Sequence, residues 1–240
     1  MLMETRIPLL KKKRSSLQYT IRGNLSRYTC LYKTARKIFQ LCRYFKWKVI
    51  CQFRKLGNRF DFDFIYSVKT NSILLCTEKE FDPYLHDALL LGGDWDISTK
   101  EFKDLDVFIA FSDHFLNDVA WEETQYYKSV LNRITEGYVP WRCANEDDLR
   151  KRFESFDALH RQIRVNGYKK QTEISPMSYD IRKIDEISVN LDRNGNLLFN
   201  NSAHRLSIAK ILGIEAIPVR VTVCHVRCSN FEALHLVGKD

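Results

Sequence analysis

The chain has 240 residues, of which 45% are hydrophobic and 28% are charged, a balance typical of a globular protein. No apolar run approaches the roughly 20 residues needed to cross a bilayer, which argues against a helical membrane protein. A short apolar patch precedes a basic run at 11–14, the reverse of the order in a signal peptide. The seven cysteines are scattered and odd in number, unlike a disulfide framework. We therefore expect an unexported, cytoplasmic protein.

Positive charge is concentrated in the first quarter of the chain. Residues 1–60 hold 16 Lys and Arg against one acid, Glu4, whereas the remaining residues hold 22 basic and 29 acidic groups. Aromatic residues are interleaved with this charge, and apolar residues over 26–56 have helical spacing. We expect a basic, aromatic-rich helical arm. It could pack on the domain with a solvated basic face, bind nucleic acid, or lie on an anionic membrane surface.

Residues 61–169 are expected to form a mostly helical region with a short hairpin. Two β-branched runs within 62–78 predict a hairpin or two short strands. Apolar spacing over 101–168 predicts helices. Asn145 precedes three acids and is a typical N-cap, and Asn166-Gly167 is a typical helix end.

The segment Asp94-Trp95-Asp96 follows paired glycines and has two interpretations. In one, the tryptophan packs inward while Asp94 or Asp96 caps the next helix. In the other, the two carboxylates face a metal-bound phosphate. Near the end of the chain, Cys224-His225-x-x-Cys228 invites a zinc interpretation, but no second ligand pair has suitable spacing, so buried thiols are favoured and no metal ligands are predicted.

Residues 170–240 change in character and predict an α+β unit. Alternation over 186–190 predicts a strand, 192–196 is a strong hairpin turn, and 197–199 predicts the return strand. An amphipathic helix follows over about 202–212 and ends at Gly213. A β-branched strand over 217–223 completes the unit. The predicted fold is therefore α+β, with a C-terminal β-hairpin–helix–strand unit, a helical middle and a basic helical N-terminus.

The start of that last predicted helix is the strongest functional candidate. Asn201 or Ser202 can cap the helix, and neither side chain is bulky enough to keep an anion away. Free N–H groups and the helix dipole favour an anion there. Arg205 can bind phosphate oxygens in a bidentate manner, and His204 can donate a hydrogen bond. The alternative is structural, with Arg205 paired to a carboxylate and His204 half-buried.

An ordered set of motifs over about residues 170–226 resembles the ParB/sulfiredoxin superfamily. The matching elements are Ile187-x-Val189, Asn194-Gly195, Asn201-Ser202-Ala203-His204-Arg205-Leu206, Ala209-Lys210-x-Leu212-Gly213 and Ile217-Pro218-Val219-x-Val221. Members of this family use the turn to hold nucleotide phosphates. The residue before His-Arg is Ala203 here, so sulfiredoxin chemistry is not expected. Asn201-Ser202 replaces the Asp-Gly of the free-serine kinases, and no helix-turn-helix pattern of a partition protein is visible after Val226.

The resemblance implies a nucleotide- or phosphate-binding protein, with phosphotransfer or nucleotide hydrolysis as its candidate chemistries. The ligand would be ATP, ADP or CTP with Mg²⁺, held by Asn201, Ser202, Ala203, His204 and Arg205. The expected catalytic residues are His204 and, as base, Glu186 or Glu173. Whether catalysis occurs is left open. The alternative is a non-enzymatic nucleic-acid-binding protein, partition or regulatory, that uses the arm over 1–60.

Overall fold

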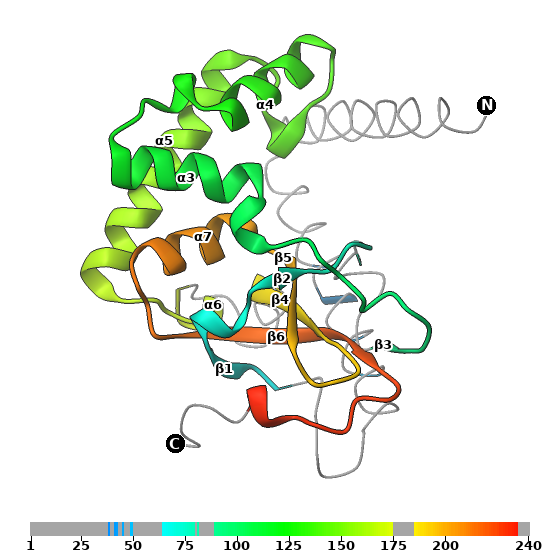
Figure 1. Ribbon diagram of the computed structural model, residues 1–240. Helices are drawn as coiled ribbons and strands as arrows, with labels where there is room; N and C mark the ends of the chain where they lie inside the picture. The colour runs from blue at the N-terminus through cyan, green and yellow to red at the C-terminus, as the bar shows by residue number, and fades with distance from the viewer. Residues whose placement is uncertain are drawn as a thin grey trace, which may run out of the picture.

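The computed structural model describes residues 64–79, 81, 89–174 and 185–234, together with five helical residues, Ile38, Leu41, Cys42, Phe45 and Val49. The rest of the expected arm over 1–60 lies outside the described residues. The described chain combines one mixed sheet of six strands with five α-helices, which confirms the predicted α+β class (Figure 1). Each helix in this part of the chain is too short or too polar to span a membrane.

The sheet is organised around its longest strand, β6. The strands are β1 (Tyr66–Lys69), β2 (Leu75–Cys76), β3 (Leu89–Leu91), β4 (Ile187–Leu191), β5 (Leu197–Asn201) and β6 (Ala216–His225). Their order is β1-β6-β4-β5-β2, and β3 also pairs with β6. β4 runs parallel to one edge of β6, while β1 and β3 pair with different stretches of the other edge. Strands from residues 61–169 thus complete the sheet of the C-terminal region.

The expected hairpin within 62–78 is not formed. β1 pairs antiparallel with β6, and β2 pairs parallel with β5, so among the described strands β1 and β2 are not neighbours. A 3-10 turn, Thr70–Ser72, follows β1 directly. The two short strands were predicted correctly, but their partners come from more than a hundred residues away in the chain. Local sequence carries no information about such pairing.

The predicted helical middle is confirmed. Its helices are α3 (Asp106–Asn117), α4 (Gln125–Thr135) and α5 (Glu146–Asn166), and the short helix α6 (Gln171–Ile174) follows at the start of the C-terminal region. α5 begins where Asn145 Oδ1 accepts a hydrogen bond from Asp148 N at 2.8 Å, and Gly167 follows its last residue with φ of 71°. Polar capping and a glycine with positive φ are the physical reasons for these two boundaries.

The predicted hairpin–helix–strand unit is present as β4, β5, α7 (Ala203–Ile211) and β6. α7 lies between the sheet and the layer formed by α3, α4 and α5 (Figure 1). Leu206 and Ala209 belong to the core on the sheet, whereas Ile208 belongs to the core of the helical layer. Because α7 is buried on both sides, its position relative to both layers is strongly constrained.

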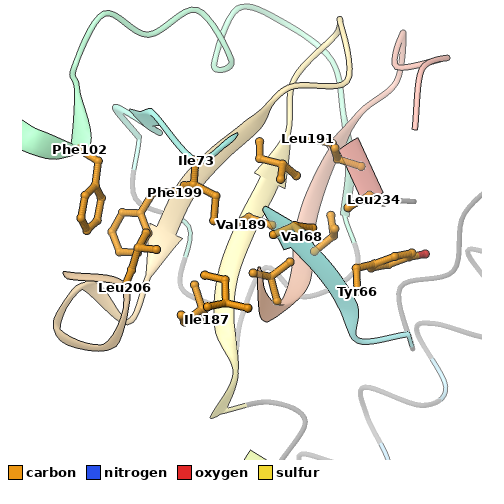
Figure 2. Packing of buried hydrophobic residues seen from close by; sticks show 14 of the residues in the cluster. Tyr66, Val68, Ile73, Phe102, Ile187, Val189, Leu191, Phe199, Leu206 and Leu234 are labelled. Atoms are coloured by element: carbon orange, nitrogen blue, oxygen red, sulfur yellow. The ribbon is translucent and has the colours of Figure 1, made fainter. Parts of the chain in front are cut away.

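The sheet core consists mainly of β-branched and aromatic side chains. Val68 on β1 and Val189 and Leu191 on β4 are buried, and Phe102 packs edge-to-face on Phe199 with ring centroids 4.9 Å apart (Figure 2). Leu206 of α7 joins this cluster, so the helix start is anchored to the sheet. The rigid attachment fixes the backbone that immediately precedes α7.

Candidate functional site

The turn from β5 into α7 leaves the first amides of the helix uncapped. Ser202, at the N-cap, has φ of 77° and ψ of 44°, a left-handed conformation that costs most non-glycine residues free energy. Its side chain does not cap the helix, and Asn201 Oδ1 accepts from Ser202 N at 2.6 Å. By contrast, Thr124 caps α4 and Asn145 caps α5. The expected capping of α7 by Asn201 or Ser202 is therefore wrong.

The uncapped turn opens into a cavity of about 650 Å³. α5 provides much of the opposite wall. The lining residues are Tyr126, Trp141, Arg152, Ser155, Phe156, Ala158, Leu159, Gln162, Asn201, Ser202, Ala203, His204 and Arg205. All five predicted binding residues are among them. Two arginines line the cavity, and no Asp or Glu is found among these described lining residues, so its electrostatic character favours an anion.

One wall of the cavity is aromatic. The Arg152 guanidinium lies 4.8 Å from the centroid of the Phe156 ring and 5.9 Å from that of Trp141. Trp141 has φ of 49° and ψ of 23° and remains 38% exposed. A bulky residue held in this conformation at a cavity is strained, and such strain is often found at binding sites. The wall can stack a planar group and place a cation beside it.

His204 is a neutral part of this aromatic wall. Its ring stacks on Phe156 with centroids 4.4 Å apart, and its Nε2 forms a hydrogen bond with the Tyr126 hydroxyl at 3.1 Å. Burial, with further contributions from Arg152 and Arg205, lowers the pKa of His204 to about 3. Burial also raises the pKa of Tyr126, so both partners are uncharged near neutral pH. His204 therefore supplies shape and stacking rather than positive charge.

Arg205 is held at the edge of the cavity by groups behind it. Its Nη2 donates to the carbonyl of Asp185 and, at 3.1 Å, to Ser202 Oγ. Its Nη1 lies 3.9 Å from Glu186 Oε2, too far for a hydrogen bond. Arg205 Nη1 and Glu186 Oε2 are both buried, and neither atom has a hydrogen-bond partner within the described chain. Arg205 thus keeps one donor, Nη1, unpaired on its buried side next to Glu186.

The two carboxylates predicted as bases do not line this cavity. The side chain of Glu186 is fully buried; its Oε1 accepts from Gln171 N, and burial raises its pKa to about 7. It contacts the cavity only through Arg205, so its geometry suits a positioning residue. Glu173 is exposed on α6 and accepts from Lys170 N at 3.3 Å. The structure therefore brings neither carboxylate to the cavity surface.

Several lining residues were missed by sequence reasoning. Tyr126 and Phe156 were expected only as part of the apolar helical pattern, and Trp141 and Arg152 were not singled out. They meet the start of α7 only because α4 and α5 pack beside it, an arrangement without local signal. The spacing of Arg152 and Phe156, four residues apart on one helix face, was the available clue.

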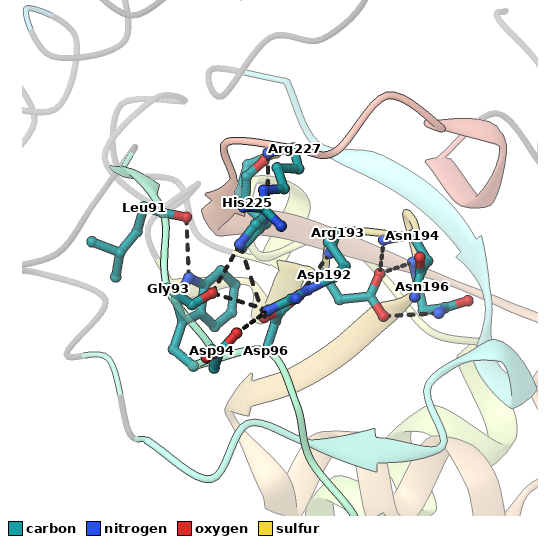
Figure 3. A network of polar contacts seen from close by, with 12 residues as sticks. Leu91, Gly93, Asp94, Asp96, Asp192, Arg193, Asn194, Asn196, His225 and Arg227 are labelled. Atoms are coloured by element: carbon teal, nitrogen blue, oxygen red, sulfur yellow. Dashed lines mark hydrogen bonds and ion pairs between the residues drawn. The ribbon is translucent and has the colours of Figure 1, made fainter.

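The carboxylates of Asp94 and Asp96 bind an arginine rather than capping a helix or facing a metal. Arg193, in the β4–β5 turn, donates to Asp96 from N, Nε and Nη2 at 2.7–2.9 Å, and from Nη2 to Asp94 at 2.8 Å (Figure 3). The hydrogen bonds from Arg193 are the main cause that lowers the pKa of Asp96 to about 2. The expected helix cap and the expected metal-bound phosphate are therefore wrong, whereas the tryptophan does pack inward, with the centroid of the Trp95 ring 5.2 Å from that of Phe81.

We call Asp94, Asp96 and Arg193 the arginine clamp. The polar groups of the residues around the arginine clamp also have hydrogen-bond partners. His225 Nε2 bonds with the carbonyl of Gly93 at 3.0 Å, and its Nδ1 accepts from Arg227 N at 3.1 Å. Trp95 Nε1 donates to the carbonyl of Leu91 at 3.1 Å. Within the described chain, no group of three or more His, Cys, Asp or Glu is placed to hold a metal ion. The clamp is a structural tie between two loops.

Comparisons with protein-family models, with curated proteins and with solved structures find no match to this chain. The resemblance to the ParB/sulfiredoxin superfamily therefore rests on the sequence motifs over about residues 170–226 alone.

Proposed function

We propose that the cavity at the start of α7 binds a phosphorylated ligand, with a nucleotide as the best fit. The observation that carries this proposal is the combination, in one cavity, of uncapped helix amides and two arginines without a lining carboxylate. A phosphate placed at the first turn of α7 would meet the N–H groups of Ala203 and His204, with Arg205 beside it. The motif resemblance to the ParB/sulfiredoxin superfamily supports the same ligand class.

The aromatic wall supports a nucleotide over free phosphate. A base could stack against Trp141 or the guanidinium of Arg152, and the volume of about 650 Å³ is in the range of small-molecule pockets. Inorganic phosphate would leave this wall unused. The proposed ligand therefore spans from the aromatic wall to the helix start.

The lining residues do not fit a protein-bound Mg²⁺. This ion prefers carboxylate oxygens, and the cavity described above has none. We therefore derive no catalytic step through a metal. Since Glu186 lies behind Arg205, the geometry supports binding better than phosphotransfer or hydrolysis. Ligand binding is accordingly the proposed function.

Isothermal titration calorimetry with the full chain tests this proposal. ATP, ADP, CTP and GTP are titrated with and without Mg²⁺, and inorganic phosphate is titrated separately. We expect at least one nucleotide to bind more tightly than phosphate. Arg152→Met should weaken that binding by about tenfold or more, because a charge-assisted contact is lost.

Arg150→Met is the matched control, since Arg150 is half exposed on the same helix and pairs with Glu122 and Glu146 outside the cavity. It should leave the affinity unchanged. The proposal would be contradicted if none of the nucleotides gave binding heat at millimolar concentration. Equal losses of affinity for Arg150→Met and Arg152→Met would also contradict it.

A further inference from the structure

The motif Cys224-His225-x-x-Cys228 places two thiols side by side at the end of β6. Cys224 is the last residue but one of β6 and is completely buried in the sheet core. The chain turns back directly after the strand, because Cys228 N donates to the carbonyl of His225 at 2.9 Å. Both thiols are free, and the two side chains are hydrogen-bonded to each other. We call Cys224 and Cys228 the thiol pair.

The turn that carries Cys228 is fixed against the β4–β5 hairpin. The carbonyl of Asn230 approaches Gly195 so closely that a Cβ there would lie 2.1 Å from the carbonyl oxygen. Gly195 also has φ of 86°, a conformation that favours glycine. The protonated Cys228 thiol donates to the same carbonyl at 3.4 Å, and its side chain packs on the sheet core. This packing holds the second sulfur beside the first.

The histidine between the two cysteines does not complete a metal site. The ring nitrogens of His225 are engaged by the carbonyl of Gly93 and by Arg227 N. A structural zinc site needs four ligands, and a catalytic zinc site needs three protein ligands. Among the described residues, no third side chain joins the two sulfurs in a metal-binding group. The thiol pair is therefore suited to the chemistry of thiols rather than to metal binding.

The two thiols are not equivalent. Cys228 is partly exposed, whereas Cys224 is closed off from solvent. The hydrogen bond from the Cys224 thiol lowers the pKa of Cys228, although burial and the charge of Asp192 act in the opposite direction. The same hydrogen bond, together with burial, raises the pKa of Cys224. The accessible sulfur is thus the one that more readily forms a thiolate, which is the reactive species.

The other buried cysteines of the described chain have neither feature. Burial raises the pKa of Cys76 to about 11 and also raises that of Cys143. The Cys143 thiol donates to the backbone carbonyl of Asp148 at 3.6 Å rather than to a second sulfur. We therefore expect these two thiols to stay inert while the thiol pair reacts.

We propose that the thiol pair is a redox-sensitive modification site, which a hydroperoxide converts into a disulfide between Cys224 and Cys228. In the first step the Cys228 thiolate attacks one peroxide oxygen, and the O–O bond breaks. Cys228 becomes a sulfenic acid, and the other oxygen leaves as water or as an alcohol after it takes up a proton.

The second step joins the two sulfurs. The Cys224 sulfur attacks the sulfur of the sulfenic acid, the S–O bond breaks, and the hydroxyl leaves as water with the proton of the Cys224 thiol. The two thiols have then lost two hydrogen atoms, which the peroxide has gained. A dithiol such as dithiothreitol returns them by thiol–disulfide exchange. This chemistry does not depend on the proposed ligand-binding cavity.

Peptide mapping of the full chain tests this proposal. The folded protein is treated with hydrogen peroxide, the remaining thiols are blocked with iodoacetamide under denaturing conditions, and the tryptic digest is analysed by mass spectrometry without reduction. Trypsin cleaves after Arg227, so the disulfide would join two otherwise separate peptides. We expect a cross-link between Cys224 and Cys228 that dithiothreitol reverses. In urea it should form about threefold more slowly or worse, because unfolding removes the hydrogen bond that favours the thiolate.

Single serine variants assign the two roles. Cys224→Ser removes the thiol that closes the bond, so Cys228 should stop at the sulfenic acid, which dimedone traps. Cys228→Ser removes the reactive thiolate, so the buried Cys224 should stay reduced. Cys42→Ser is the matched control, because it removes an exposed thiol outside β6. This variant should form the cross-link as the parent protein does.

The parent protein decides the proposal even if a serine variant does not fold, which circular dichroism checks. The proposal is overturned if iodoacetamide still blocks both Cys224 and Cys228 after peroxide treatment. It is also overturned if either residue is joined mainly to a different cysteine, or if the cross-link forms as fast in urea as in the folded chain. In a folded Cys228→Ser variant, oxidation of Cys224 at the parent rate would contradict the assigned roles.

Discussion

Two arginines at opposite ends of the β4–β5–α7 unit meet carboxylates in different ways. Arg193 makes short hydrogen bonds to both carboxylates of the clamp and to the carbonyl of Gly93. Arg205 approaches Glu186 only to 3.9 Å and lies beside a cavity with uncapped helix amides. The clamp satisfies its polar groups within the protein, whereas the cavity leaves polar groups available for a ligand.

This difference distinguishes structural from functional polar groups. Buried polar groups cost free energy unless they are hydrogen-bonded, so a satisfied network stabilises the fold and has nothing left to bind with. Groups left without partners at a cavity make the empty protein less stable and a complementary ligand more favourable. We therefore expect mutations in the clamp to change the free energy of unfolding, and mutations in the cavity to change the affinity for a ligand.

The largest expected effect is on the clamp. Asp96→Ala should lower the free energy of unfolding by about 2 kcal/mol, because it removes three charge-assisted hydrogen bonds that Arg193 donates to a buried carboxylate. Asp94→Ala is the matched control: Asp94 also bonds Arg193, but its side chain is 79% exposed. Its loss should cost less than about 1 kcal/mol. Urea unfolding followed by circular dichroism measures both, and equal effects would remove the distinction between buried and exposed partners.

The next effect concerns His204 and pH. Its pKa is about 3 in the folded protein and near 6.5 in the unfolded chain, so the unfolded state binds an extra proton between these values. The neutral, buried His204 ring therefore costs the folded protein no stability above about pH 6.5. Below that pH the free energy of unfolding decreases, and it continues to decrease as the pH falls towards 3. His204→Phe should reduce the loss of stability between pH 7 and pH 5 by about 2 kcal/mol.

Tyr126→Phe controls for the hydrogen bond to His204, since it removes that bond and retains the titrating imidazole. This variant should keep the pH dependence of the parent protein. Urea unfolding at pH 5 and pH 7 gives the comparison. If the free energy of unfolding had the same pH dependence in the parent protein and in His204→Phe, then His204 would not be held neutral in the folded state.

The smallest expected effect is at the turn before α7. Ser202→Gly should have a free energy of unfolding about 1 kcal/mol higher than that of Ser202→Ala, because both variants lose the hydroxyl but only glycine adopts φ of 77° without steric cost. Ser202→Ala keeps that cost and removes the hydroxyl that accepts from Arg205, so it should be destabilising. Thermal unfolding of the two variants checks the order. If Ser202→Gly were the less stable variant, the turn would not be strained.

The fold was predictable where its signals are local. The turn before β5, the cap at Asn145 and the glycine ends of α5 and α7 all follow from short patterns in the chain. The residues Asn201–Arg205, which line the cavity, were singled out for the same reason. Contacts between distant segments of the chain were not predictable. Asp96 lies 97 residues from Arg193 in the chain. Arg152 reaches the cavity only because its helix packs beside α7. The catalytic roles expected of Glu186 and Glu173 lacked any spatial constraint.

We propose that a ligand binds at the start of α7 and not at the arginine clamp. Amide and indole NMR shifts of the full chain, recorded during titration with the nucleotide that binds best, test it most directly. We predict the largest shifts at the backbone N–H groups of Ala203, His204 and Arg205 and at the indole of Trp141. The indole of Trp95, beside the clamp, should not move. Shifts centred on Trp95 and Arg193, or none at millimolar nucleotide, would contradict the claim.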